Sequence, residues 1–352
     1  MTMHAVVEKI PALTTLVRKT FTGRRTWHPF ELVFWAAVAA TLFVAPDRHL
    51  ILTEIAWLAL FALSLDLILG YAGIVSLGHA AFFGVGAYAA GLLAKHEIVN
   101  EPLLALLVSG CAAAVLGFVA SFLVLRGSDL TRLMVTLGIA LVLRELANKH
   151  AWLTGGADGL QGVTIKPLLG LFRFDMFGHT GYYYSVAVLA VLFLIARRMM
   201  NSSFGLSLRA IKDNPKRAAA IGIPLNARLV AIYTIAAGYA GIAGALLTQT
   251  TAFTSLDVFS FERSADLLLV LIIGGTGYLY GGLIGAILFK LLQDYLSAVT
   301  PQYWPFWIGL LLVAIVLIGR DRLASWAMPL HRLAARFDWR RAFSASALRD
   351  GS

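Results

Sequence analysis

Cysteine, charge and acidic side chains are all scarce in this sequence. Cys111 is the only cysteine among 352 residues, so the chain can form no internal disulfide and no multi-cysteine metal site. Charged residues make up 14% of the chain and hydrophobic residues 59%, which excludes a set of water-soluble domains. The 29 lysines and arginines outnumber the 19 aspartates and glutamates. Because this basic excess falls in short loops and the two tails, we expect no nucleic-acid partner.

Long apolar runs are abundant, and a mean hydropathy of +0.79 indicates that the chain is surrounded by lipid. We predict an all-α polytopic membrane protein with about ten transmembrane segments. The eighth segment has only about 13 residues, or about 20 Å of helix, so we expect a broken or re-entrant helix there. The predicted segments are 31–45, 51–69, 73–94, 103–125, 132–148, 182–196, 228–249, 262–274, 282–299 and 305–320.

The distribution of lysine and arginine predicts that both termini are cytoplasmic. With the N-terminus inside, 21 of the 29 basic residues fall in inner segments, six in outer segments and two within spans. Cytoplasmic loops are the ones that retain positive charge. The chain then consists of a cytoplasmic tail 1–30, a membrane domain 31–320 and a basic cytoplasmic tail 321–352. The membrane domain carries a long outer loop, 149–181, and a long inner loop, 197–227.

The first apolar run is interpreted as a retained helix. The basic stretch before it is too extended for an ordinary secretory signal. Cleavage near residues 37–40, where small residues gather, is the alternative.

The inner loop contains the segment NSSFGLSLRAIKDNPKRAAAIGIPLN, which begins at Asn201. Pro215 should divide it into two short helices, because an internal proline removes a backbone donor. Gly222 and Pro224 should end the second helix. Apolar residues on one side and basic residues elsewhere make the segment amphipathic. Such a segment is suited to a groove on a motor protein, and a surface helix on lipid headgroups is the alternative.

A glycine-rich stretch from Asp66 to Leu93 is a candidate wall of a transport pathway. Gly70 and Gly73 permit a broken helix whose free backbone groups can line a cavity. Ser76 and His79 are polar inside that stretch, and an ionisable residue within a membrane is a functional candidate. The alternative is that His79 packs at a helix interface. No metal-ligand cluster accompanies it in the sequence.

A second glycine-rich stretch, IGGTGYLYGGLIGA from Ile273, separates the eighth and ninth predicted spans. It lacks the Lys-Ser/Thr pair of a phosphate-binding loop, and its flanks are membrane helices. We therefore expect nucleotide to bind to another protein. Its glycines Gly274, Gly275 and Gly277 join the candidate pathway wall.

The outer loop contains TGGADGLQGV from Thr154, a turn-rich segment. We interpret it as a docking surface or an external lid, with a simple connecting turn as the alternative. Polar residues at the outer end of the fifth span, Arg144, Glu145 and Asn148, are expected to reach the membrane interface. The candidate docking residues are Thr154, Gly155, Gly156, Asp158 and Gly159.

Four stretches together resemble the permease subunits of branched-chain amino-acid ABC importers, in particular the LivM-like branch. They are GYAGIVSLGHAAFFGVGAYAA from Gly70, TGGADGL from Thr154, LRAIKDNPKRAAAIGI from Leu208 and LLLVLIIGGTGYLYGGLIGA from Leu267. They lie at family-like spacing over about 50–320. The chain departs from the family at Ile74, where many relatives have glutamine, at Pro215-Lys216, where an acidic residue is common, and at Gly282, where proline is usual.

The resemblance implies a subunit of a larger importer in a bacterial inner membrane. Its partners would be a second homologous permease forming a heterodimer, two cytoplasmic ATPase subunits that bind ATP and Mg, and a periplasmic substrate-binding protein. No cofactor would bind to this chain. The inner loop would be the coupling loop, and the matching residues are Arg209, Asp213, Asn214, Ala218, Ala219 and Gly222.

The expected function is inward transport of leucine, isoleucine and valine, without bond-making chemistry. Related permeases for urea or short-chain amides are similar, so they remain an alternative. A secondary transporter would need no coupling helix and would usually carry a carboxylate in mid-membrane, which we do not find in the sequence. An intramembrane enzyme built on His79 lacks a partnered nucleophile nearby in the sequence.

Overall fold

The computed structural model describes residues 29–44, 48–99, 101–175 and 178–318. Most of the predicted N-terminal tail and the whole C-terminal tail lie outside these residues. A helix is found at each of the ten predicted spans, as the sequence leads us to expect. The helices are α3 (Pro29–Val44), α4 (His49–Ala72), α5 (Ala80–Lys95), α6 (Pro102–Val124), α7 (Asp129–Lys149), α9 (His179–Met200), α12 (Leu225–Thr251), α13 (Phe261–Gly274), α14 (Leu279–Val299) and α15 (Trp304–Ile318).

Five of these helices, α4, α6, α9, α12 and α14, are long and apolar enough to cross a membrane. α5 is apolar but shorter, with 16 residues. α13 has 14 residues, or about 21 Å of helix, which is less than the roughly 30 Å of a hydrocarbon core. The expectation of a short eighth segment is therefore confirmed.

The chain separates into two compact units, which are described one at a time: residues up to Lys290 and residues from Leu291 onward. In the first unit, α12 packs on α4, α5 and α6. Small residues let these helices approach closely, because a side chain at Gly86 would overlap Gly241, and one at Gly244 would overlap Phe83. In the second unit, α15 carries Phe306 and Trp307 in an edge-to-face arrangement, with ring centroids 5.4 Å apart.

The third predicted span, 73–94, is wrong at its start. α4 runs on to Ala72 and ends at Gly73, which adopts a left-handed conformation with φ 73°. Residues 73–79 form no regular helix, and α5 begins only at Ala80. Gly78 lies so close to the backbone of Thr136 in α7 that no side chain would fit. The broken helix expected from the glycines of this stretch is therefore confirmed, but the break is longer than the sequence suggests.

A second break separates α13 from α14. Gly275 and Gly277 have φ of 99° and 81°, values that residues with side chains rarely adopt. The Gly275 N–H donates to Leu271 O at 2.7 Å and so satisfies the end of α13.

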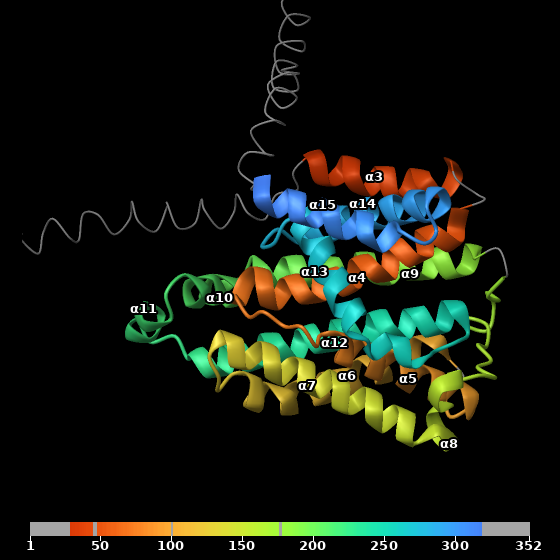
Figure 1. Cartoon of the computed structure of the whole chain (residues 1–352), viewed down its shortest axis with the longest axis horizontal. Coiled ribbons are helices and arrows are strands. Elements are labelled where there is room, and N and C mark those ends of the chain that lie inside the picture. Colours follow the sequence, from red (N-terminus) through yellow and green to blue (C-terminus); the bar gives the residue numbers. More distant parts are fainter. Residues whose placement is uncertain (1–28, 45–47, 100, 176–177, 319–352) are drawn as a thin grey trace, which may run out of the picture. The chain divides into compact units, whose positions relative to one another are not determined.

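Three short helices mark the ends of the first unit. α10 (Ser203–Asp213) and α11 (Pro215–Ala220) lie at one end, and α8 (Ala151–Thr154) lies at the opposite end (Figure 1). We call these the α10 end and the α8 end. The 3-10 turns η2 (Gly156–Asp158) and η3 (Leu256–Phe259) follow α8 and α12 along the chain. Among the described residues only two isolated β-bridges form, and one of them joins Leu160 to Thr254.

Candidate functional site

The segment after α9 folds into two helices, as predicted. Pro215 is the first residue of α11, and the side chain of Asn214 accepts a hydrogen bond from the Arg217 N–H at 3.0 Å. This capping, together with the missing proline donor, explains why the helix restarts at this point. Gly222 has φ 85° and follows the end of α11, which confirms the predicted glycine stop.

The exposed tip of α10 and α11 carries most of the residues expected to contact a partner. There are two exceptions: the side chain of Ala218 is only 2% exposed and packs inward, and Arg209 contacts Tyr71 of α4. Ile221 is 69% exposed and is the large apolar side chain that the tip presents beside its basic residues. The exposed residues of the tip include Asp213, Asn214, Lys216, Arg217, Ala219, Ile221 and Gly222.

Two basic residues of α10 contact the end of α4 instead of extending from the exposed tip. Arg209 lies over the ring of Tyr71, with its guanidinium carbon 5.0 Å from the ring centroid. The Lys212 Nζ donates to Gly70 O at 2.7 Å. The Lys212 stem also lies against Gly73, since an ideal Cβ on that glycine would be 3.1 Å from Lys212 Cγ. α10 therefore contacts the end of α4 and the first residue of the first helix break.

The same end of α4 contacts the second helix break. Asp66 is fully buried, and its Oδ1 accepts a hydrogen bond from the Gly277 N–H at 2.7 Å. A Cβ on Gly70 would overlap Asp66 Oδ1 and would lie 2.5 Å from Gly277 N. Only glycine at position 70 allows this contact. We call Asp66, Gly70, Gly73, Lys212 and Gly277 the break junction.

Two residues of the break junction are absent from the sequence-based candidates. Asp66 carries a detectable signal, because a carboxylate inside an apolar span is costly unless it is bonded. Asp66 lies in the predicted span 51–69 but only six residues before the end of α4, so the absence of a proton-relay carboxylate in mid-membrane stays a prediction. Lys212 has no comparable signal, since it is one of several basic residues in a polar segment.

The remaining candidate glycines of the second break do not reach α4. Gly274 lies against the backbones of Gly281 and Gly285, and Gly275 lies against Gly281. These contacts close the turn between α13 and α14. The structure therefore brings Gly70, Gly73 and Gly277 together at the junction and places Gly274 and Gly275 in the adjoining turn.

Ser76 and His79 are buried, with 0% and 1% of their surface exposed. The His79 Nε2 lies 2.9 Å from Ser64 Oγ, and that hydroxyl donates to Phe61 O at 2.6 Å. Because the Ser64 hydroxyl proton is already donated to Phe61 O, His79 Nε2 must donate its own proton to Ser64 Oγ. His79 therefore cannot act as a base toward Ser64. The Phe61 ring stacks on His79 at 5.8 Å. These contacts favour packing, and a pathway role for His79 and Ser76 stays a prediction.

The outer loop is tightly folded where TGGADG follows α8. Thr154 Oγ1 donates to Ala147 O at 2.5 Å and to His150 O at 3.0 Å, which ties the loop to the end of α7. Gly155, Gly156 and Gly159 all have positive φ. Of the five candidate docking residues, only Asp158 is exposed. A docking role therefore stays a prediction, and Asp158 would carry its side-chain contact.

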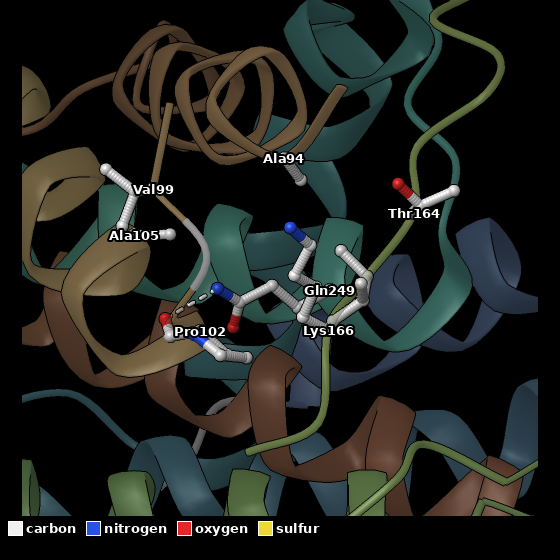
Figure 2. Close-up of a pocket in the computed structure, with 8 residues that line it drawn as sticks. Ala94, Val99, Pro102, Ala105, Thr164, Lys166 and Gln249 are labelled. Carbon is white, nitrogen blue, oxygen red and sulfur yellow. Dashed lines mark hydrogen bonds between the residues drawn. The ribbon is translucent and has the colours of Figure 1, made fainter. Parts of the chain in front are cut away.

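A small cavity lies beneath this loop (Figure 2). Gln249 points into it from α12, where its Nε2 donates to Pro102 O at 2.8 Å and its Oε1 accepts from the Tyr184 hydroxyl at 2.9 Å. Lys166, on the loop side, pairs with Glu97 at 3.5 Å. The cavity volume is about 10 Å³, enough for one water molecule and too small for an amino acid.

The loop meets α9 at Asp175. Burial acts to raise the pKa of this carboxyl, but hydrogen bonds from His179 Nδ1 and the Thr180 N–H outweigh it, so the pKa lies below its ordinary value. The His179 to Asp175 distance is 2.6 Å. The charged carboxylate is thus favoured at the start of α9, where the helix dipole also favours negative charge.

Comparison with known proteins places these features in a family. Residues 49–318 match the model of the branched-chain amino acid transport system / permease component. The chain is 26% identical to the high-affinity branched-chain amino acid transport system permease protein LivM of Escherichia coli over 292 residues, covering 77% of this chain and 68% of that protein.

Two other relatives are named for different substrates, one for branched-chain amino acids and one for ribose. The probable branched-chain amino acid transport permease protein LivM of Methanocaldococcus jannaschii is 24% identical over 321 residues, covering 74% of this chain and 88% of that protein. The ribose import permease protein RbsC of Bacillus subtilis is 29% identical over 181 residues, covering 45% and 54%. No solved structure matches. Because the family model covers most of the described helices, this chain belongs to the branched-chain amino acid transport system permease family.

Proposed function

We propose that this chain is the permease subunit of an ABC importer that carries leucine, isoleucine and valine inward. Family membership supports the importer, and the relatives named LivM support the substrate. The chain is also similar to a permease named for ribose, so similarity alone does not determine the substrate. Related permeases for urea or short-chain amides are the alternative that the experiment below must exclude.

One observation carries the proposal most strongly: α10, next to the exposed tip, is bonded to the end of α4, and that end contacts the second helix break. Lys212 contacts Gly70, and Gly70 lies against Gly277. Two cytoplasmic ATPase subunits, which bind ATP and Mg, would contact the importer, one of them through this tip. A displacement of the tip then acts on two irregular segments at once, as alternating access requires.

The proposed topology has ten membrane helices, with α13 re-entrant and both termini in the cytoplasm of a bacterial cell. The chain lies in the inner membrane. The α10 end faces the cytoplasm, in agreement with the excess of lysine and arginine in the inner segments. The α8 end faces outward, where a substrate-binding protein would dock. A second homologous permease would complete the pathway.

The buried Asp66 does not favour a secondary transporter. Its Oδ1 accepts the Gly277 N–H, which gives it a structural role at the end of α4. A carboxylate that relays protons must instead exchange protons with water during transport. A secondary transporter would also run without ATPase subunits, so co-purification of those subunits with this chain distinguishes the two.

Reconstitution tests the function. The chain is co-expressed with its partner permease, ATPases and binding protein and placed in liposomes. We expect ATP-dependent leucine uptake and leucine-stimulated ATP hydrolysis. Stimulation by urea or ribose, with none by leucine, isoleucine or valine, would contradict the substrate while leaving the importer in place.

The orientation can be tested separately because the chain has one cysteine. In a Cys111→Ser background, Ala219→Cys should react with an impermeant maleimide only when the cytoplasmic face is open. Gln161→Cys, exposed in the outer loop, should react from outside. Labelling of Ala219→Cys from outside would contradict the proposed docking of ATPases.

A further inference from the structure

A second and larger cavity lies at the α8 end and takes its polar groups from α7. Its volume is about 500 Å³, within the range of small-molecule sites. Arg144, Glu145 and Asn148 supply a cation, an anion and an amide, and three apolar residues complete the wall. We call this the outer cavity. Its lining residues are Leu141, Arg144, Glu145, Asn148, Ala157 and Leu256.

The two charges of the outer cavity are exposed and unpaired. Arg144 and Glu145 make no hydrogen bond or ion pair with any residue that the structure describes. Arg144 lies five residues, or about 8 Å, before the end of α7. Charged side chains near a helix end can reach the aqueous interface, and these two also line the outer cavity. This face of α7 therefore meets water or a ligand.

The polar groups gather on one side of α7. At about 100° per residue, Arg144, Glu145 and Asn148 fall within an arc of about 100°. Val142 and Leu146 are exposed too, but they lie farther round the helix. Leu141 falls within the same arc, so the cavity side of α7 combines three polar side chains with one apolar side chain.

The opposite wall of the cavity is rigid. Ala157 belongs to η2, which Thr154 ties to α7. The Leu160 N–H donates to Thr254 O at 2.7 Å, and this joins the TGGADG loop to the segment before η3. Leu256 belongs to η3, which packs on α7 and α5. The glycine-rich loop is therefore a fixed wall of a cavity.

We propose that the outer cavity receives the amino acid as it enters the permease. Arg144 binds the carboxylate, Glu145 binds the ammonium group, and Leu141, Ala157 and Leu256 contact the branched aliphatic side chain. A neutral molecule such as urea would use neither charge. This inference rests on the proposed function and adds a substrate site to it.

The site is tested by measuring ligand binding to the assembled complex of permease and ATPase subunits in nanodiscs. The binding protein is left out. Saturation-transfer NMR follows three probes: leucine, 4-methylpentanoate, which lacks the ammonium group, and leucinamide, which lacks the carboxylate. We expect Arg144→Gln to weaken leucine and 4-methylpentanoate by about 10-fold or more and to leave leucinamide unchanged. Glu145→Gln should weaken leucine and leucinamide and leave 4-methylpentanoate unchanged. Lys149→Gln, which removes an exposed cation outside the cavity, is the control.

Three other outcomes would overturn the proposed site. Equal binding by the variants and the original complex would show that neither charge touches substrate. Weaker docking of the loaded binding protein, with free leucine binding unchanged, would assign the charges to that protein. A complex that imports leucine but does not bind it in this assay would exclude the cavity. Import of urea without leucine would instead contradict the proposed function. ATPase activity of each variant confirms assembly.

Discussion

Charged side chains are bonded at the break junction and unpaired in the outer cavity. At the junction, Asp66 is fully buried and bonded to Gly277, and Lys212 is bonded to Gly70. In the outer cavity, Arg144 and Glu145 are exposed and have no partner among the described residues. A bonded charge fixes geometry, whereas an unpaired charge is ready to bind something else. We therefore assign the transmission of motion to the break junction and contact with the substrate to the outer cavity.

The outer cavity and the break junction also differ in the rigidity of their backbones. The walls of the outer cavity are clamped by hydrogen bonds of Thr154 and Leu160. The junction instead joins two helix breaks that are rich in glycine, where the backbone can change conformation at low cost. We therefore expect substitutions at the junction to affect assembly and coupling, and substitutions in the outer cavity to affect binding.

The largest effect should come from Gly70→Ala. Its Cβ would overlap Asp66 Oδ1 and press on the Gly277 backbone, which cannot move without opening the second break. We expect a loss of about 1–3 kcal/mol in stability and loss of uptake. Thermal unfolding of the complex in detergent, followed by tryptophan fluorescence, measures the first.

Gly138→Ala is the matched control for this substitution. Gly138 is also a helical glycine, but a Cβ there would meet nothing within 4 Å. Because alanine favours helix over glycine, this variant should be unchanged or more stable by about 0.5–1 kcal/mol. Equal behaviour of the two variants would mean that the close contact of Gly70 and Gly277 is unimportant.

A smaller and more selective effect is expected for Lys212→Met. Methionine preserves the apolar stem against Gly73 and removes the donor to Gly70 O. Because a hydrogen bond to a charged group contributes about 1.5–3 kcal/mol, we expect the number of leucine molecules imported per ATP to fall about 10-fold. Lys216→Met removes a neighbouring cation from the exposed tip and is the comparison. An unchanged transport ratio in Lys212→Met would remove the proposed link.

Gly222→Val should act at the tip alone. Gly222 has φ 85° and open space around it, so valine causes backbone strain of about 1–2 kcal/mol without a clash. We expect the end of α11 to shift, so that ATP hydrolysis becomes uncoupled from uptake while membrane insertion is intact. Gly162→Val, at φ 74° in the outer loop and also in open space, imposes the same strain at the other end. Uptake equal in both variants would contradict the coupling role.

The sequence predicts where the long apolar helices lie, because apolar length is written directly into it. It also predicts the two-helix coupling segment, since Pro215 and Gly222 act locally. It cannot place Lys212 against Gly70, because the two residues are 142 positions apart and nothing local joins them. The role of Arg144 is missed for a related reason. Whether a charge near a helix end reaches the interface or lines a cavity depends on η2 and η3, which come from distant parts of the chain.

The smallest effect should come from Asp175→Asn, at the α8 end but outside the outer cavity. The pKa of Asp175 is lowered in the folded state, so its contribution is complete above the ordinary aspartate range and is lost as pH falls through the folded pKa. The pair with His179 is largely exposed, and we expect less than about 1 kcal/mol at neutral pH. Thermal unfolding between neutral pH and strongly acidic pH measures this, and the variant should lose the part of the acid dependence that Asp175 supplies. Because the residue lies outside the cavity, leucine binding should stay constant. A change in leucine affinity as large as that of Arg144→Gln would mean that charge anywhere at the α8 end affects binding, and the distinction between the cavity and its surroundings would fail.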